Sequence, residues 1–255
     1  TLSHSQRIIG RITGSKQGPT LVFFGGIHGN EPAGVTALEQ VFKTLQIHQN
    51  QLNGTVFGIK GNLKGLAFQK RYIDNDLNRI WHPIAISSVL RRDPQYLNTE
   101  EAELLHLYQI IAKILLEESP PYYFIDLHTT SSPTPPFITI SDAMINRKFA
   151  ALFNTPIVLG LEEYLQGTLL NYINHRGYVS LGFEAGQHQA PESVTNCVSF
   201  ILQSLVYTDV LSDNTYKCIM AKHPSLNTSK KFSFYEVVAH LHISLGGRFR
   251  MLPGY

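Results

Sequence analysis

TLVFFGGIHGNEPAG, residues 20–34, contains a strand, a turn and the start of a helix. Its run of β-branched and aromatic residues predicts a strand over 20–26. Because Leu21 to Phe24 are apolar without interruption, we expect the strand to be buried on both faces, with helices on both sides of its sheet. After Pro32, apolar residues recur at helical spacing, so the strand leads directly into a helix. This unit predicts an α/β fold.

Runs of the same kind recur between helical patterns along the rest of the chain. The further strands expected are 55–61, 122–128, 137–140, 156–160 and 178–184. Two more helices are expected, one capped by Thr99 with acidic residues in its first turn and one opened by Pro191. The predicted fold class is therefore α/β, with a mixed, mostly parallel sheet flanked by helices.

Two stretches differ from this alternation. Residues 61–82 are rich in Gly, Asn, Lys, Arg and Asp and show little periodicity, and loops of that length are usually functional or disordered. FSFYEVVAHLHI, residues 232–243, alternates loosely as a strand, and no helical pattern follows it. We therefore expect an irregular functional loop in the first half of the chain and a partial β segment at its end.

Composition and charge exclude several classes of protein. Lysine and arginine total 21 against 19 acidic residues, and bases never gather in a long run, so nucleic acid is not an expected partner. The apolar stretch around Ile110 to Leu116 is interrupted by Lys113 and falls short of the roughly 20 residues that a bilayer requires, so no membrane partner is expected. Two cysteines without a CxxC motif argue against a disulfide framework and favour a reducing, cytoplasmic location.

Three residues with metal-ligand chemistry follow buried strands. His28 and Glu31 come after the 20–26 strand, at the end where open α/β sheets bind ligands, and His128 ends another apolar strand. Imidazole nitrogen and carboxylate oxygen both suit zinc at ~2.0–2.2 Å, and three such ligands leave one position for water. A single histidine is more often a surface or core residue, so the prediction rests on the joint pattern. Asp126 should share the strand face of His128 and orient a ligand.

Four motifs in order, GGIHGNEPAG, RYIDNDLNR, DLHTT and GFEAG, resemble those of the aspartoacylase and succinylglutamate desuccinylase family, a branch of the zinc carboxypeptidase fold. The resemblance extends over about residues 30–240. It implies a zinc-dependent amidohydrolase that cleaves the amide bond of a small N-acyl amino acid through metal-activated water. It also implies that His28, Glu31 and His128 bind one zinc ion per chain.

The resemblance assigns roles to four further residues. Glu184 matches the general base and acid, and Arg71 matches the arginine that polarises the scissile carbonyl. Asn78 and Arg79 match the pair that holds the carboxylate of the substrate. These roles are chemically sound, because Glu184 ends an apolar strand at the same edge as the metal and the planar fork of arginine suits a carboxylate. The alternatives are a surface salt bridge for the glutamate and solvated loop charges for the arginines.

One position departs from the family. Aspartoacylases carry a further arginine shortly before the catalytic glutamate, where it recognises the acidic side chain of N-acetylaspartate. This chain has Leu170 near the corresponding place, and Arg176 is the candidate substitute for binding substrate. N-acetylaspartate is therefore not established as the substrate, and another N-acyl amino acid or small amide is equally compatible.

Other motifs are absent from the sequence or have a simpler explanation. The sequence contains no GxSxG, GxGxxG or GxxxxGK, which removes the common serine hydrolase, dinucleotide and P-loop interpretations. His240 and His242 alternate on one strand face, but no third ligand lies nearby in the sequence. We therefore expect packing or solvent exposure for these two histidines.

These observations predict a zinc hydrolase catalytic domain over 1–230, followed over 231–255 by the beginning of a C-terminal β domain. The family usually adds such a domain, which narrows the entrance to the zinc site, so we expect a more open cleft here. Two alternatives stay open: a zinc carboxypeptidase or peptide amidase on the same scaffold, and a non-catalytic metal or small-molecule binding module. The sequence does not predict the oligomeric state or the acyl group, and another divalent ion could replace zinc.

Overall fold

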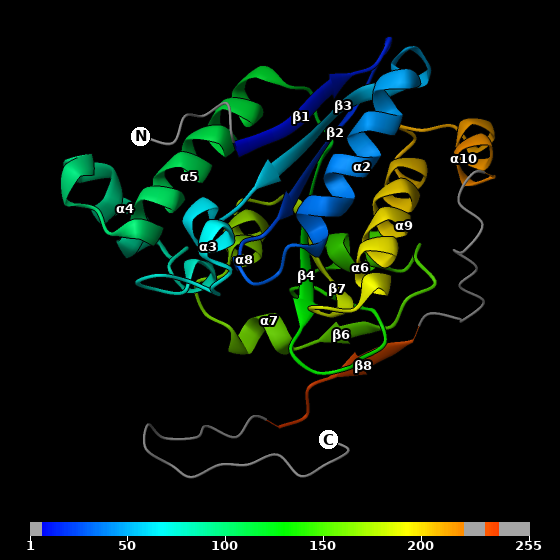
Figure 1. Ribbon diagram of the computed structural model, residues 1–255. Helices are drawn as coiled ribbons and strands as arrows, with labels where there is room; N and C mark the ends of the chain where they lie inside the picture. The colour runs from blue at the N-terminus through cyan, green and yellow to red at the C-terminus, as the bar shows by residue number, and fades with distance from the viewer. Residues whose placement is uncertain (1–6, 222–232, 240–255) are drawn as a thin grey trace.

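The computed structural model describes residues 7–221 and 233–239. Within these residues the strands form one eight-stranded sheet in the order β1-β3-β2-β4-β7-β5-β6-β8 (Figure 1). The strands are β1 (Ile8–Thr13), β2 (Lys16–Gly25), β3 (Asn53–Lys60), β4 (Tyr122–Thr130), β5 (Phe137–Thr139), β6 (Ile157–Leu159), β7 (Val179–Gln187) and β8 (Phe234–Glu236). The β1–β3 and β5–β7 pairs are antiparallel and the other five pairs are parallel. The mixed, mostly parallel sheet is thus confirmed.

Helices cover both faces of this sheet. The α-helices are α2 (Ala33–Ile47), α3 (Leu63–Phe68), α4 (Pro83–Arg91), α5 (Thr99–Glu117), α6 (Met144–Ala150), α7 (Leu161–Tyr164), α8 (Leu169–His175), α9 (Pro191–Tyr207) and α10 (Asp213–Met220). Helices α2 and α9 pack against each other on one face (Figure 1). Helices α5 and α8 contribute to the core on the other face.

The central strand β2 sends alternate side chains into two hydrophobic cores. Leu21 and Phe23 belong to the core beneath α2 and α9, and Val22 and Phe24 belong to the core beneath α5 and α8. All four side chains are fully buried, as the uninterrupted apolar run predicts. Burial of each such side chain stabilises the fold by about 1.5–3 kcal/mol. Strand β2, which leads into the turn that contains His28, is therefore packed against a hydrophobic core on both of its faces.

Three local features differ from the sequence-based expectations. Strand β1 was not predicted, and its half-exposed, Gly- and Arg-containing sequence explains why. Asn98, not Thr99, caps α5, because its side chain accepts a hydrogen bond from the Glu101 N–H while the Glu101 carboxylate accepts one from the Asn98 N–H. The stretch 61–82 is also more regular than its composition indicates.

That stretch contains helix α3 and a 3₁₀ turn at Leu77–Arg79. The side chain of Asn62 caps α3 by accepting a hydrogen bond from the Gly65 N–H. The side chain of Asp76 caps the 3₁₀ turn by accepting one from the Asn78 N–H. Two of the polar residues in this stretch, Asn62 and Asp76, are thus the N-caps of short helical segments that the sequence pattern does not reveal.

Strand β8 pairs in parallel with β6 at the edge of the sheet, and its three residues are exposed. The strand expected within 232–243 is therefore present at Phe234–Glu236. His240, His242 and the rest of 240–255 lie outside the described residues. The boundary near residue 230 and the more open cleft stay predictions.

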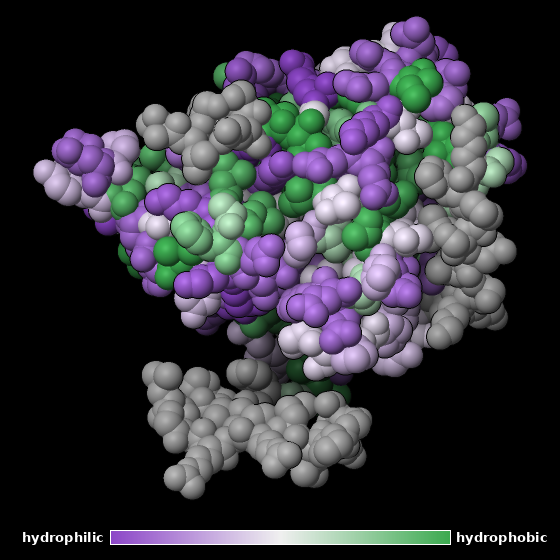
Figure 2. All heavy atoms as spheres, viewed as in Figure 1, coloured by the Kyte–Doolittle hydropathy of each residue, from purple (hydrophilic) through white to green (hydrophobic). Residues whose placement is uncertain are grey.

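Polar and apolar residues are interspersed over the face that carries α2, α4 and α5 (Figure 2). Among the helices that the structure describes, none has both the length and the apolar character needed to cross a bilayer.

Candidate active site

The first two candidate ligands lie in the turn between β2 and α2. An added Cβ at Gly29 would lie 1.9 Å from the carbonyl carbon of Gly65, so only glycine lets this turn lie directly against α3. His28 precedes Gly29 in the sequence and Glu31 follows it, and both side chains are buried. The tight turn therefore directs an imidazole and a carboxylate to the carboxyl end of the sheet.

The third candidate ligand and the candidate base lie on two neighbouring strands. His128 of β4 and Glu184 of β7 are register partners in the parallel pair. His128 is buried and Glu184 is half-buried. Since both strands end at the same edge as the turn after β2, the sheet places these two side chains beside His28 and Glu31.

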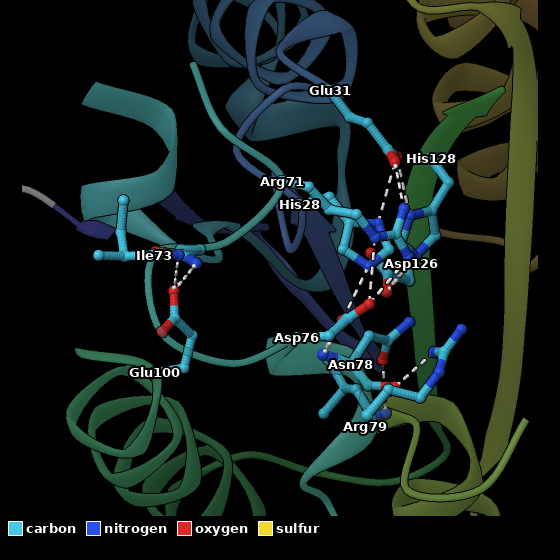
Figure 3. A network of polar contacts seen from close by, with 12 residues as sticks. His28, Glu31, Arg71, Ile73, Asp76, Asn78, Arg79, Glu100, Asp126 and His128 are labelled. Carbon is cyan, nitrogen blue, oxygen red and sulfur yellow. Dashed lines mark hydrogen bonds and ion pairs between the residues drawn. The ribbon is translucent and has the colours of Figure 1, made fainter. Parts of the chain in front are cut away.

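His28, Glu31 and His128 converge on one point (Figure 3). Glu31 Oε1 lies 2.9 Å from His28 Nδ1, and Glu31 Oε2 lies 3.0 Å from His128 Nδ1. One ligand atom from each residue lies within 4.8 Å of the others. Ligands at zinc-type bond lengths around a tetrahedral ion lie roughly 3.4 Å apart, which agrees with this spacing. The three residues could therefore bind a metal ion.

A carboxylate meets the far nitrogen of each histidine. Asp76 Oδ1 lies 3.2 Å from His28 Nε2, and Asp126 Oδ2 lies 2.7 Å from His128 Nε2. Such partners keep the proton on Nε2 and direct the lone pair of Nδ1 toward the ion. Asp126 has the ligand-orienting contact that the sequence predicts, whereas Asp76 was not predicted.

These carboxylates also control the charges in the site. Burial lowers the pKa of His128, but the neighbouring carboxylates of Asp126 and Glu31 outweigh it and raise that pKa well above its usual value. Burial raises the pKa of Glu31, but hydrogen bonds from His128 and His28 outweigh it and lower that pKa. Without a metal, the imidazole of His128 thus favours the protonated form beside the ionised carboxylate of Glu31. A bound cation would displace that proton from the imidazole.

Glu184 is different, because its pKa is raised. Burial raises it to about 7, more than the nearby positive charge of His128 lowers it. Its Oε2 is buried and has no hydrogen-bond partner among the described residues. A carboxylate with a pKa near neutrality and a free oxygen has the properties required of a general base.

The irregular loop supplies two arginines and an amide. The Arg71 Nη2 lies 3.0 Å from Asp76 Oδ2, and its Nη1 lies 3.6 Å from Glu31 Oε1. The Arg79 Nη1 donates a hydrogen bond to the Asn78 carbonyl oxygen. Asn78 is buried, and its Oδ1 accepts a hydrogen bond from the N–H of Leu169 in α8. Both guanidinium groups keep donors available for an anion.

One cavity of about 280 Å³ brings most of the predicted site residues together. Its lining includes His28, Glu31, Arg71, Asn78, Arg79, His128 and Glu184. Arg176 does not line this cavity. Its side chain is exposed just after the end of α8, and its guanidinium lies 5.6 Å from the centre of the Tyr172 ring. Arg176 therefore lies outside this cavity, and its role in binding substrate stays a prediction. Leu170 is a buried residue of α8.

The loop is held by a buried carboxylate that the sequence did not single out. Glu100 in the first turn of α5 is fully buried and accepts hydrogen bonds from the N–H groups of residues 73, 74 and 75 (Figure 3). The side chain of Asn62 donates a further one. In return, Asp74 accepts a hydrogen bond from the Thr99 N–H. Since Asp76 follows this anchored segment directly, Glu100 fixes the part of the loop that contacts His28 and Arg71.

His188 is another cavity residue that the sequence did not single out. Its Nδ1 lies 2.7 Å from the hydroxyl of Thr129, the residue after His128. Burial lowers its pKa, so the ring favours the neutral form. The sequence points to His188 only through its position four residues after Glu184. That signal is too weak to distinguish a site residue among eleven histidines.

Comparisons with known proteins identify the family of the chain. The family model described as the succinylglutamate desuccinylase/aspartoacylase catalytic domain matches residues 17–198. A succinylglutamate desuccinylase of Serratia proteamaculans is 31% identical over 109 residues, which are 43% of this chain and 31% of that protein. A probable aspartoacylase of Trichodesmium erythraeum is 24% identical over 241 residues, which are 89% of this chain and 79% of that protein.

A crystal structure of a succinylglutamate desuccinylase/aspartoacylase from Rhodobacter sphaeroides has the same fold. It matches with a TM-score of 0.60 at 21% sequence identity, over 79% of this chain and 58% of that chain. The chain thus spans less than two thirds of that protein, and its match to the Serratia protein covers about a third of the latter. Because the family model matches most of its residues, the chain belongs to the succinylglutamate desuccinylase/aspartoacylase family of deacylases.

Proposed function

We propose that this protein is a zinc-dependent amidohydrolase that cleaves the amide bond of an N-acyl amino acid. One observation supports the proposal above all: the donor atoms of His28, Glu31 and His128 converge in the same cavity as Glu184. Two imidazole nitrogens and one carboxylate oxygen form the ligand set of many catalytic zinc sites, in which water takes the fourth position. Family membership supports the amide-cleaving activity.

His28, Glu31 and His128 would hold the metal, with Asp76 and Asp126 fixing the two imidazole rings. When bound, zinc supplies a Lewis acid that lowers the pKa of water and polarises a carbonyl oxygen. The set fits a zinc ion because it is buried, oxygen- and nitrogen-rich and already converged.

Glu184 would move the protons. Its free Oε2 accepts a proton from the attacking water and later donates it to the departing amine. The pKa of about 7 suits both steps, because the group can lose and regain a proton near neutral pH. The position of Glu184 next to His128 on the neighbouring strand keeps this carboxylate beside the metal ligands.

The loop residues would bind and orient the substrate. Arg79 and Asn78 provide donors for the carboxylate of the amino acid. Arg71, close to Glu31, is placed to stabilise the negative charge that develops on the carbonyl oxygen. A cavity of about 280 Å³ is suited to a small molecule of this kind.

A panel of N-acyl amino acids, assayed beside a panel of chromogenic peptides with the zinc-loaded protein, tests the proposal. We expect turnover of the acyl amino acids. Preference for peptides would favour the carboxypeptidase or amidase alternative, and no turnover by a fully loaded protein would favour the binding module. The cytoplasmic location is also proposed; both cysteines, Cys197 and Cys218, are free thiols.

A further inference from the structure

A buried glutamate of α7 lines the candidate substrate cavity. Glu162 is 5% exposed. Its Oε1 accepts a hydrogen bond from the Thr139 hydroxyl at 3.3 Å, and its Oε2 accepts one from the Thr168 hydroxyl at 2.9 Å. Within the described residues it forms no ion pair with a lysine or an arginine. Burial raises the pKa of Glu162, and the positive charge of His128 offsets this only in part, so a further cation placed in the cavity would stabilise the carboxylate.

Strand register places Glu162 close to the reacting groups. Its partner Thr139 lies opposite Gly182 of β7, two residues before Glu184. Residues two apart share a strand face and are separated by roughly 6.6 Å. A Cβ at Gly182 would lie 2.4 Å from the Thr139 hydroxyl, so glycine leaves the space that this hydroxyl occupies beneath Glu162.

Glu162 also lies next to the carboxylate-binding residues of the loop. The Asn78 side chain contacts the Leu169 N–H, and the hydroxyl of the preceding residue, Thr168, contacts Glu162. Glu162 should therefore face the amino-acid half of a substrate whose carboxylate is held by Asn78 and Arg79. The acyl half would lie on the far side of the scissile bond.

We propose that Glu162 determines side-chain specificity and that the substrate is an N-acyl derivative of a basic amino acid, whose side-chain cation pairs with this carboxylate. The inference rests on the function proposed above. Arg79 is assigned to the carboxylate of the substrate, and Arg71, which contacts Asp76 and Glu31, is assigned to the carbonyl oxygen, so neither arginine is left for an acidic side chain. An acidic side chain at this position would therefore lie against the carboxylates of Glu162 and Glu184, and juxtaposed like charges are costly in a desolvated site.

A purely structural role for Glu162 has to be distinguished from this one. Thr168 caps α8, so Glu162 also links α7 to the start of α8 and to β5. Loss of such a link would affect all substrates alike. Loss of a specificity determinant would change their relative rates.

The test uses three compounds of similar size: N-acetylornithine, N-acetylglutamine and N-acetylglutamate. For the zinc-loaded protein we expect kcat/KM to fall in that order, with at least about a tenfold difference between the cationic and the anionic compound. Glu162→Gln should reduce this ratio to within about threefold. Glu163→Gln is the matched control, because Glu163 is the exposed neighbour on the same helix, and it should leave the ratio unchanged.

An anionic compound that reacts as well as the cationic one would overturn the inference, and so would an unchanged ratio in folded Glu162→Gln. Should that variant fail to fold, the order found with the unaltered protein decides. Calorimetric binding of the three compounds separates the two proposals. If none is hydrolysed but the cationic one binds tightest, the proposed function fails and the inference on charge stands; if the anionic one binds tightest, the inference fails.

Discussion

His128 and Glu184 are register partners on the adjacent parallel strands β4 and β7. Neighbouring strands lie about 4.8 Å apart, so the sheet itself sets the separation of these two backbone positions. The arginines, in contrast, come from a loop that depends on hydrogen bonds to Glu100. The candidate base and one candidate metal ligand thus lie on neighbouring strands, whereas the candidate substrate-binding arginines lie on a loop segment whose position depends on Glu100.

Glu184→Gln should remove the proton acceptor while keeping the shape of the side chain. We expect kcat to fall at least ~10²-fold, the usual scale of general acid and base catalysis, with zinc content and substrate binding retained. Single-turnover kinetics with metal analysis on the same sample check this. Near-normal turnover would exclude Glu184 from the mechanism.

The raised pKa of Glu184 predicts the pH dependence of the reaction. The group must be ionised to accept a proton, so kcat/KM should rise with pH and level off above the pKa of this carboxyl, which is about 7 in the metal-free site. Bound zinc, a further positive charge, would move this limb to lower pH. A rate that falls steadily as the pH is raised from 5 to 7 would contradict the assignment of Glu184 as the base.

Arg79 and Arg71 should give different kinetic effects. Arg79→Lys should mainly raise KM, because lysine binds the substrate carboxylate more weakly and this carboxylate is already charged in the ground state. Arg71→Lys should mainly lower kcat, because the charge on the carbonyl oxygen develops only in the transition state. Free-acid and esterified forms of one substrate provide the control: if Arg79→Lys affected both equally, Arg79 would not be the carboxylate anchor.

Glu100→Gln tests the anchoring of the loop. Glutamine has one acceptor oxygen in place of two and adds a donor facing backbone N–H groups, so the loop should loosen. We expect kcat/KM to fall about tenfold, mainly through KM, corresponding to a loss of about 1–2 kcal/mol in hydrogen bonding. Glu101→Gln is the matched control in the same helical turn, since Gln can replace Glu in the capping box. Equal effects of the two variants would argue against a specific role for Glu100.

The strands that carry the site could be predicted because they are buried on both faces. The largely apolar runs before His28, His128 and Glu184 indicate their strands, and parallel strands bring their carboxyl ends to one edge. The convergence of His28, Glu31 and His128 could therefore be predicted from the sequence pattern, whereas Glu184 was identified through the family resemblance.

The supporting contacts could not be predicted because they join residues far apart in the chain. Glu100 and Glu101 both look like acidic residues favoured at a helix N-terminus, yet one is buried against the loop and the other caps the helix. Glu162 similarly stands beside Glu163, and only the fold shows which of them is buried. Asp76 lies in the NDLN motif, but its contact with His28 spans 48 positions.

The most direct test of the proposed zinc centre compares the purified protein with His128→Ala. The zinc content of each is measured by mass spectrometry, and the zinc affinity of each is determined on the same samples. The ligand set predicts one zinc ion per chain in the unaltered protein and a loss of affinity of several orders of magnitude in the variant. Stoichiometric zinc held at unchanged affinity by His128→Ala would contradict the assignment of His28, Glu31 and His128 as the metal site.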